Sequence, residues 1–260
     1  MDLRNASRLF YGGVEAQALY RGADLLWTKP TVGGHPLQPY FDSGAILIYL
    51  SDENATLDAS GNVVALQNIG GAGGAFSATV VGNALPLVNG MLQFSGGTGG
   101  YVQLNNAADI RGVDFCWIMQ SPWTNGMRLF GKPSPDPQTD IRFDTNASGT
   151  NLTLRRVVGG TTTLVSLSPR FPYTTAKGLF RMSMGATAGN FFQNGALART
   201  FGHSYANFPL LDLGKGLDTS SRFNGGIGDV FGVLSDHPQA AAALTAAQIY
   251  VAAKHGITLA

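Results

Sequence analysis

The sequence predicts an all-β fold, an antiparallel sandwich closed by one helix at the C-terminus. Three features of the 260 residues support this prediction: 35 Gly and 12 Pro, a charged fraction of only 13%, and fourteen Asp against two Glu. Long surface helices favour Glu and Lys, and both are scarce here. Short runs rich in Val, Phe and Thr instead alternate with turn residues about every ten positions, a pattern typical of sandwiches and barrels.

Strands are expected wherever such an apolar run ends in turn residues. Two connections, Gly159-Gly160 and Asn194-Gly195, predict two-residue hairpins, because Gly and Asn reach a positive φ at little cost. The expected strands of the main domain, residues 40–260, cover 45–50, 63–66, 90–94, 101–104, 113–119, 128–130, 140–143, 152–158, 161–167, 179–184, 190–193, 196–201 and 227–234.

Residues 1–29 are expected to form a separate three-stranded β-meander, and residues 30–39 a Pro- and Gly-rich linker. So small a sheet cannot bury a core of its own, and it must therefore dock on the rest of the chain or on a partner. Its strands are expected at 7–11, 14–20 and 25–27, with a turn at Gly12-Gly13. The side chains expected to anchor it are Leu9, Tyr11, Leu19, Tyr20, Leu25 and Trp27.

The one helix that the sequence predicts covers residues 246–255. Thr245 and Gln248 fit a capping box, and Leu244 and Ile249 are spaced as a hydrophobic staple. Gly256 is placed as a left-handed stop, and a histidine in the last turn favours the helix dipole. The side chains expected to face the core are Ile249, Tyr250 and Ala253.

Charge and hydropathy exclude two classes of partner. The net charge is only +1, so the basic stripe of a nucleic-acid-binding protein is not expected. No apolar run approaches 18 residues, so membrane insertion is not expected either. The first residues, MDLRN, do not lead into the apolar core of a secretory signal, which predicts synthesis in the cytoplasm. The single cysteine, Cys116, lies in an apolar run and is expected to be a buried thiol.

No catalytic constellation is evident, so we expect a protein without enzymatic activity and assign no catalytic residue. A glycosidase needs two carboxyl groups roughly 5–10 Å apart. The two Glu residues, Glu15 and Glu53, lie in different predicted units, and a pair of Asp residues stays open without a local pattern to support it. The segment around Ser204, GHSYA, lacks the last Gly of a nucleophile elbow and is more typical of a polar loop.

Neither a metal nor a cofactor is expected. The four His residues include no pair at metal-ligand spacing. The glycine-rich segments 70–74 and 96–100 lack the Lys of a phosphate-binding loop. Two groups of residues could offer oxygen atoms to calcium, but neither matches an established calcium loop; they are Asp52, Asp58 and Asn62, and Asp140 and Asp144.

An exposed aromatic ring is the expected contact for a glycan, because aromatic rings stack on the apolar face of a sugar. Trp123 lies in the predicted loop 121–126 and is the first candidate, with Asn125 beside it and Tyr101 at the start of a predicted strand. The alternative for Trp123 is a lid over the core.

Several segments follow one another in a characteristic order: LIYLSD at 47–52, LQN at 66–68, LQFSG at 92–96 and YVQL at 101–104. Near the end come FNGGIGDVFGVL at 223–234 and a helical segment at 244–257. Over residues 40–260 this order resembles the concanavalin A-like, laminin-G-like jelly-roll domains of bacterial surface and phage virion proteins. Gly97-Thr98-Gly99 stands where relatives often carry acidic residues, so the resemblance does not imply a calcium site here.

The N-terminal segments LFYGG at 9–13 and ALYRGADLLW at 18–27 resemble the short meander that opens many structural proteins of tailed phages and gene-transfer agents. The two resemblances together imply a non-enzymatic, homo-oligomeric protein on the surface of a virion, made in the host bacterial cytoplasm. They imply other virion proteins as partners of residues 1–30 and host surface polysaccharide as a ligand of the sandwich. A bacterial carbohydrate-binding module or surface adhesin is the first alternative, and a polysaccharide-degrading enzyme is the second.

Overall fold

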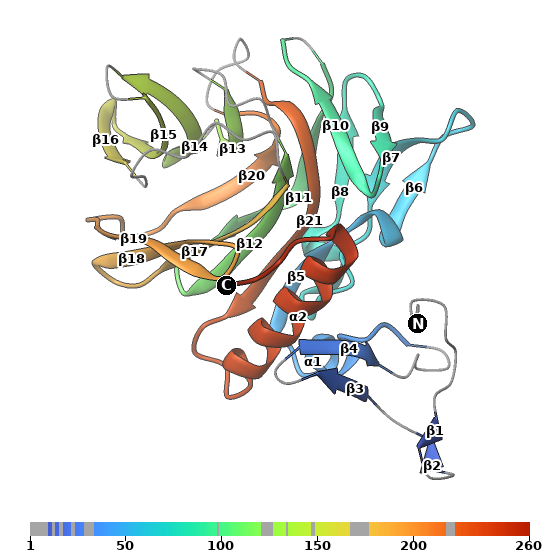
Figure 1. Ribbon diagram of the computed structural model, residues 1–260. Helices are drawn as coiled ribbons and strands as arrows, with labels where there is room; N and C mark the ends of the chain where they lie inside the picture. The colour runs from blue at the N-terminus through green and yellow to red at the C-terminus, as the bar shows by residue number, and fades with distance from the viewer. Residues whose placement is uncertain are drawn as a thin grey trace. The chain divides into compact units, whose positions relative to one another are not determined.

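The computed structural model describes residues 34–97, 99–120, 127–133, 135–146, 149–166, 177–216 and 222–260, together with four short strands before residue 29. The chain divides into two units, Met1–Pro39 and Tyr40–Ala260. Figure 1 shows strands in both units and one long helix at the C-terminal end. In the part of the chain that the structure describes, no helix is long and apolar enough to cross a membrane.

In the first unit, expected to be a three-stranded meander, the described residues form four short strands in two antiparallel pairs. β1 (Phe10–Tyr11) pairs antiparallel with β2 (Val14–Glu15), and β3 (Ala18–Arg21) pairs antiparallel with β4 (Asp24–Thr28). Residues 16–17, inside the strand expected over 14–20, lie outside the described residues, so that strand is described only as β2 and β3. Leu9 and the turn at Gly12-Gly13 lie outside the described residues, and the other five anchor residues are described as strand positions only, namely Tyr11, Leu19, Tyr20, Leu25 and Trp27.

The second unit is an antiparallel β-sandwich of the jelly-roll type, built from two sheets. Sheet I consists of β5 (Ile46–Leu50), β10 (Met91–Ser95), β21 (Asn224–Leu234), β12 (Val113–Gln120), β17 (Gly178–Met184), β18 (Ala188–Gln193) and β19 (Ala196–Gly202). Sheet II consists of β6 (Ala55–Leu57), β7 (Asn62–Leu66), β8 (Ala78–Val81), β11 (Tyr101–Asp109), β20 (Pro209–Leu213), β13 (Arg128–Lys132), β14 (Gln138–Asn146), β15 (Gly149–Val158) and β16 (Thr161–Ser166).

The two sheets are joined by β9 (Leu85–Val88), which pairs with β10 of sheet I and with β7 of sheet II. Both two-residue hairpins expected from the sequence are present, at Gly159-Gly160 and at Asn194-Gly195, with all four residues at positive φ. Four strands were not expected, β6, β8, β9 and β20. Each of them is only three to five residues long, and β9 contains Pro86 while β20 begins at Pro209. Proline removes a donor from the ladder and weakens the strand pattern.

The hydrophobic core lies between the two sheets, and the pairing registers show which side of sheet II faces it. The registers bring five side chains into one row across the sheet, Val102, Leu213, Phe130, Ile141 and Leu154. All five are buried in the core. Because neighbouring positions of a strand point to opposite faces, the adjacent row of residues points away from the core.

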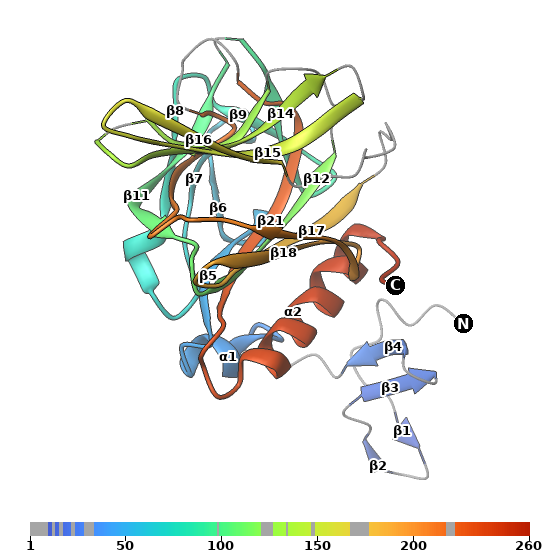
Figure 2. The same ribbon diagram turned by 90° about the vertical axis from the view of Figure 1, so that its left-hand side faces the viewer.

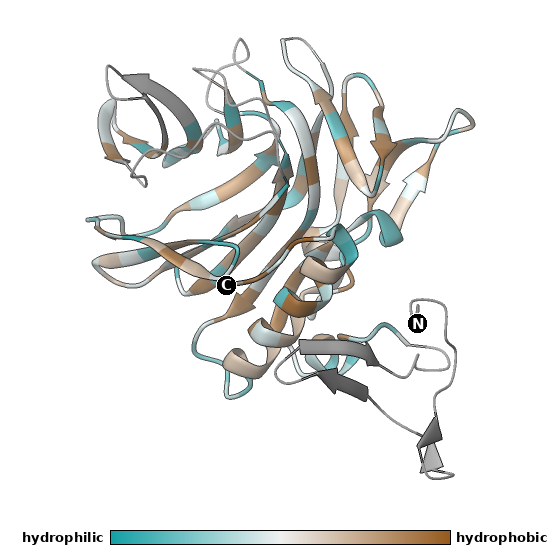
Figure 3. Cartoon of the chain, viewed as in Figure 1, coloured by the Kyte–Doolittle hydropathy of each residue, from teal (hydrophilic) through white to brown (hydrophobic). Residues whose placement is uncertain are grey.

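Trp117 on β12 occupies the middle of this core. Its ring centroid lies 5.3 Å from that of Phe130, 5.9 Å from Phe180 and 6.2 Å from Phe191. Aromatic pairs at these distances stabilise a core beyond the area that they bury. Figure 3 shows hydrophobic positions in brown along β12 and β21, the central strands of sheet I. Cys116, beside Trp117, is fully buried as expected, and burial raises the pKa of its thiol.

The C-terminal helix α2 (Ala240–His255) covers the outer face of sheet I. Figure 2 shows it on the side of β17, β18 and β21 that faces away from β14–β16. The helix contacts β21 and β5, where Phe231 and Tyr49 are register neighbours and are fully buried. A second, short helix, α1 (Gln38–Asp42), begins within the expected linker, with Pro39 in its first turn, where proline is tolerated.

Two expectations for α2 were wrong. The helix begins at Ala240, six residues before the expected start, because the run of alanines at 240–243 favours helix. The Thr245 hydroxyl consequently donates to the Ala241 carbonyl inside the helix instead of capping its end. The buried face consists of Ala243, Ala247, Val251, Ala252 and His255 and not of Ile249, Tyr250 and Ala253. Small alanines let the helix lie close to the sheet. The stop at Gly256 is confirmed by its left-handed φ of 67°.

Candidate functional site

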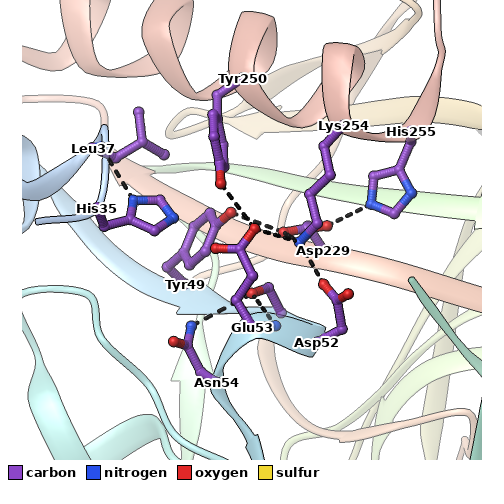
Figure 4. Close-up of polar contacts among 11 residues, drawn as sticks. His35, Leu37, Tyr49, Asp52, Glu53, Asn54, Asp229, Tyr250, Lys254 and His255 are labelled. Carbon is purple, nitrogen blue, oxygen red and sulfur yellow. Dashed lines mark hydrogen bonds and ion pairs between the residues drawn. The ribbon is translucent and has the colours of Figure 1, made fainter. Parts of the chain in front are cut away.

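A cluster of polar side chains joins the end of α2 to sheet I (Figure 4). We call it the α2 cluster, and it consists of Tyr49, Asp52, Glu53, Asp229, Tyr250, Lys254 and His255. The residues come from β5, from the 3₁₀ turn η1 (Asp52–Asn54), from β21 and from α2. Segments that are distant in the sequence therefore meet at this point.

Asp229 is the centre of the α2 cluster. The Tyr49 hydroxyl donates to its Oδ1 over 2.8 Å, Lys254 Nζ lies 3.1 Å from the same oxygen, and His255 Nε2 lies 2.5 Å from Oδ2. The side chains of Asp229 and His255 are 0% and 1% exposed. Gly228 leaves room for the imidazole, because a Cβ there would stand 2.9 Å from His255 Cε1. Since a buried carboxylate needs such partners, Asp229 fixes the last turn of α2 to the sheet.

Lys254 extends the cluster to the turn η1. Its Nζ contacts Asp52 and lies 3.0 Å from Glu53 Oε1, which also accepts a hydrogen bond of 2.8 Å from the Tyr250 hydroxyl. Burial works to lower the pKa of Lys254, but Asp229, Asp52 and Glu53 outweigh it and raise that pKa. A protonated Lys254 thus pairs with all three carboxylates, which favours a structural role over acid–base chemistry.

Of the residues considered as calcium ligands, Asp58 and Asn62 stay together, Asp52 has a different partner, and the side chain of Asp144 lies outside the described residues. Asp58 Oδ1 accepts hydrogen bonds from the backbone N–H groups of Ser60 and Asn62, over 2.8 and 2.9 Å. This pattern is an Asx-turn, in which the carboxylate stabilises the local backbone. Asp52 instead pairs with Lys254, and Asp140 is a mid-strand residue paired with Arg155. Within the described residues, no group of three or more His, Cys, Asp or Glu side chains could hold a metal ion.

A second polar cluster lies on the outer face of sheet II, which neither α-helix of the described chain covers in Figures 1 and 2. The pairing registers place Gln103, Asp212, Gly131, Asp140 and Arg155 in one row across five strands. This row is adjacent to the core-facing row and therefore points outward. We call it, with the charged and aromatic side chains around it, the sheet II patch: Tyr101, Gln103, Arg128, Asp140, Arg142, Arg155, Asp212, Lys215 and Arg222.

Asp140 organises one half of the sheet II patch. Its Oδ2 lies 2.5 Å from Arg155 Nη2 and 3.8 Å from Arg128 Nε, and Arg142 adds a third positive charge nearby. The Asp140 side chain is completely buried, and burial raises the pKa of its carboxyl even though three guanidinium groups act to lower it. Arg155 and Arg142 are half-buried, so parts of both remain accessible beside a fixed carboxylate.

Asp212 organises the other half. Its Oδ1 accepts a hydrogen bond of 3.0 Å from Gln103 Nε2, and Lys215 Nζ lies 3.4 Å from Oδ2. The segment around Lys215 crosses the row at Gly131, where a Cβ would stand only 2.6 Å from the Cα atom of Gly216. Glycine at both positions allows this close approach of two backbones.

The three expected glycan contacts fall in different places. Trp123 and Asn125 lie outside the described residues. Tyr101 belongs to the sheet II patch but is only 8% exposed, with Lys215 Nζ 4.1 Å and Arg222 Cζ 5.1 Å from its ring centroid. Two cations therefore lie over the Tyr101 ring, so its face is not open for stacking on a sugar. Contact between Tyr101 and a glycan stays a prediction.

Sequence reasoning missed both clusters. A signal for the sheet II patch was present in the alternation Thr139-Asp140-Ile141-Arg142-Phe143, which places Asp140 and Arg142 on one face of a strand. For the α2 cluster, the signal was Asp229 inside the apolar run of the last long strand. A carboxylate in such a run is expected to be buried and paired.

Comparisons with known proteins identify the architecture. No family model and no curated protein matches the sequence. One similar solved structure is domain 4 of AbnA, a GH43 extracellular arabinanase from Geobacillus stearothermophilus, in complex with arabinotriose. It aligns with a TM-score of 0.52 and 14% sequence identity, over 73% of this chain and 92% of that chain. The sialidase of Trypanosoma rangeli aligns with a TM-score of 0.47 and 11% identity, over 80% of this chain and 32% of that one. At 14% identity the likeness to the arabinanase domain concerns the fold alone, and it agrees with the jelly-roll type of antiparallel β-sandwich found in the second unit.

Proposed function

We propose that this protein is a non-enzymatic, carbohydrate-binding β-sandwich that holds its ligand on the sheet II patch. The observation that carries the proposal is the row Gln103, Asp212, Asp140 and Arg155 on a sheet face that neither described α-helix covers. Gln103 and Arg155 are half-buried, and their amide and guanidinium groups suit the adjacent hydroxyl groups of a sugar, whereas Asp212 and Asp140 are completely buried beneath them. Because Asp140 and Asp212 are held by their neighbours, the donors and acceptors are pre-organised.

The comparison with the arabinanase domain supports this proposal. That domain was solved with a bound trisaccharide, and the likeness covers most of both chains. At 14% identity the likeness concerns the architecture, so the location of the ligand rests on the sheet II patch and not on the relative.

Absence of catalysis is part of the proposal. In the α2 cluster, Lys254 pairs with Asp52, Glu53 and Asp229, so all three carboxylates are engaged in ion pairs. In the sheet II patch, Asp140 is engaged by Arg155. We therefore expect no release of reducing ends from any polysaccharide that the protein binds.

Attachment to a virion, with Leu9, Tyr11, Leu19, Tyr20, Leu25 and Trp27 as anchors, stays a prediction from the sequence resemblance. Its test is a chain that begins at Pro36. We expect that chain to keep the melting temperature of the sandwich and to be excluded from the particle, whereas normal incorporation would refute the anchor.

Affinity electrophoresis tests carbohydrate binding directly. The protein is run in gels that contain arabinan, mixed-linkage β-glucan, polygalacturonate or dextran sulfate. We expect retardation in at least one gel, and we expect Gln103→Ala to weaken it by about tenfold, since a lost polar contact is worth about 1.4 kcal/mol. Gln193→Ala, a half-buried amide on sheet I, is the matched control. Migration unaffected by all four polymers would refute the proposal.

A further inference from the structure

A buried histidine lies in the loop 203–208, which joins β19 of sheet I to β20 of sheet II. His203 is 9% exposed, and its ring centroid lies 5.5 Å from that of Tyr205 and 6.0 Å from that of Phe201. Its Nδ1 accepts a hydrogen bond of 3.3 Å from the backbone N–H of Tyr205. Nδ1 accepts that bond only while it carries no proton, so this geometry requires the neutral imidazole.

Tyr205 fastens the loop to the hairpin of β15 and β16. It is 2% exposed, and its hydroxyl donates to the Thr163 carbonyl on β16 over 3.3 Å and faces the Leu154 carbonyl on β15 at 3.5 Å. Arg156 of β15 makes a second connection, because its guanidinium donates to the backbone and side-chain oxygens of Asn207 over 3.0 and 2.9 Å. The loop therefore holds the hairpin from two positions.

This hairpin carries part of the sheet II patch. Arg155 lies on β15 between Leu154 and Arg156, the two residues that the loop contacts. Its Nη2 lies 2.5 Å from Asp140 Oδ2, so Arg155 connects the hairpin to the centre of the patch. A hairpin released from the loop would displace Arg155 and with it the proposed saccharide-binding surface.

Protonation of His203 opposes the contacts of the loop. An imidazolium ion has no acceptor, so the bond from the Tyr205 N–H would be lost. The new charge would also lie near Arg111, whose Nη1 donates to the Tyr205 carbonyl over 3.2 Å. Burial lowers the pKa of His203, and Arg111 lowers it further, whereas the backbone groups of Ala188 and Gly185 act in the opposite direction.

The other charged groups around the loop are already bonded. Arg156, with its Cζ 6.0 Å from the Tyr205 ring centroid, is a permanent cation. Asp109 Oδ1 accepts hydrogen bonds from the backbone N–H groups of Arg111 and Phe208, over 3.1 and 2.9 Å. Among the described residues, no carboxylate forms an ion pair with His203 that would stabilise its protonated form.

We infer that His203 is a pH-sensitive switch, whose protonation releases the β15–β16 hairpin and weakens saccharide binding at the sheet II patch. The inference rests on the proposed carbohydrate-binding function and names its regulation. A lowered pKa means that the closed loop holds the proton less tightly than an opened loop. The closed loop is therefore fully stable above about pH 6.5, the ordinary pKa of His, and weakens as the pH falls below it.

Amide hydrogen exchange of the unliganded protein tests the switch itself. After correction for the intrinsic pH dependence of exchange, we expect protection in β15 and β16 to be about tenfold lower at pH 4.5 than at pH 7.5, because one pKa unit corresponds to tenfold in an opening equilibrium. His203→Asn keeps an acceptor near the position of Nδ1 and does not titrate, so it should show little change. His203→Gln makes the same comparison should His203→Asn fold poorly.

His237→Asn is the matched control. His237 Nδ1 also accepts a hydrogen bond from the backbone N–H two residues on, over 3.1 Å from Gln239, but at an exposed position. We expect this variant to follow the unmodified protein at both pH values. The comparison is needed because burial also raises the pKa of the carboxyl groups of Asp140 and Asp212, which belong to the patch.

Affinity electrophoresis in arabinan and in mixed-linkage β-glucan tests the effect on binding, because neither polymer carries a charge that changes with pH. Binding to the closed hairpin requires release of one proton, so the dissociation constant should rise by up to about tenfold for each pH unit below the titration of His203. We expect binding at pH 4.5 to be at least about fivefold weaker than at pH 7.5 in the unmodified protein and in His237→Asn, and nearly unchanged in His203→Asn.

The outcomes separate the switch from the proposed function. The same pH dependence of exchange in His203→Asn as in the unmodified protein would overturn the switch, because another group would then titrate. Loss of protection in the hairpin without weaker binding would overturn its link to the saccharide site. Migration unaffected by any polymer at pH 7.5 would overturn the proposed function and that link, whereas exchange in β15 and β16 would still decide the switch.

Discussion

At the scale of single residues, Asp229 makes contacts that no neighbouring side chain can replace. It is fully buried and bonded to Tyr49, Lys254 and His255. Asp229→Asn removes the buried charge, leaves His255 Nε2 facing an amide, and leaves Lys254 with Asp52 and Glu53 as its remaining partners. Breaking a buried ion pair in this way costs about 3–5 kcal/mol, and we expect the free energy of unfolding in urea to fall by that amount.

Asp236→Asn is the control for this prediction, since it makes the same change at an exposed position between β21 and α2. An exposed substitution of this kind should alter the free energy of unfolding by less than about 0.5 kcal/mol. Equal unfolding curves for the two variants would mean that Asp229 does not hold the helix.

Gly131 is the residue that lets the backbone cross the sheet II patch. Gly131→Ala would place a Cβ 2.6 Å from the Cα atom of Gly216, so one backbone must move. We expect a loss of about 1–3 kcal/mol in the free energy of unfolding and weaker saccharide binding. Gly202→Ala is the comparison, because nothing lies within 4 Å of a Cβ at that position. If both variants unfolded alike, the close approach at Gly131 would be wrong.

At the scale of elements, attachment of α2 should depend on alkaline pH. Burial, followed by Asp229, raises the pKa of Tyr49, and the surrounding carboxylates outweigh burial to raise the pKa of Lys254. A raised pKa means that the folded state holds its proton more tightly than the unfolded state. In the unfolded chain, Tyr and Lys have pKa values of about 10 and 10.4. The stability that the two raised pKa values contribute is therefore fully present below about pH 10 and is lost as the pH rises above these unfolded values.

Unfolding in urea between pH 8 and 11 measures this dependence. We expect a plateau up to about pH 9.5 and a decline above it. Tyr49→Phe removes one titrating group and should make the decline shallower, by at most about 1.4 kcal/mol for each pH unit. A stability that increases above pH 10, or an unchanged slope in Tyr49→Phe, would contradict the account of the α2 cluster.

The helix itself is expected to be part of the fold. Deleting residues 244–260 would uncover Tyr49 and Phe231, both fully buried, and would leave Asp229 without Lys254 and His255. Each large apolar side chain that is exposed costs roughly 1.5–3 kcal/mol. We expect the shortened protein to aggregate or to melt at a clearly lower temperature in calorimetry. A soluble product with an unchanged melting temperature would show that α2 is dispensable.

The elements differ in how far the sequence predicts them. Long strands such as β12 and β21 follow from apolar runs, and the hairpins at 159–160 and 194–195 follow from turn residues, because both signals are local. Short strands interrupted by proline, such as β9, carry too little local signal. The buried face of α2 could not be predicted from the sequence. It consists mainly of alanines, which hydropathy does not distinguish from the alanines on the exposed face of the helix.

At the scale of the whole molecule, both polar clusters depend on register and not on sequence spacing. The row from Gln103 to Arg155 crosses five strands whose order, β11, β20, β13, β14 and β15, is set only once the two sheets close around the core. Residues 103 and 212 meet through this order alone. A sequence can show which strands carry outward polar residues, but not which of those residues become neighbours.

The two faces of the sandwich consequently have different roles in this account. On sheet I, the buried carboxylate of Asp229 is paired with Lys254 and His255 of the helix that covers it. On sheet II, the paired polar groups Gln103–Asp212 and Asp140–Arg155 lie on a face that neither described α-helix covers. The central claim is that the second face, and not the first, is the saccharide-binding surface.

Amide hydrogen exchange with and without a polysaccharide that retards the protein in affinity electrophoresis tests this claim most directly, because it reports every strand at once in the unmodified protein. The account predicts slower exchange in β11, β14, β15 and β20 at saturating ligand, with exchange in α2 and β5 unchanged. Protection centred on α2 and β5, or no protection in sheet II at a ligand concentration that saturates binding, would contradict it.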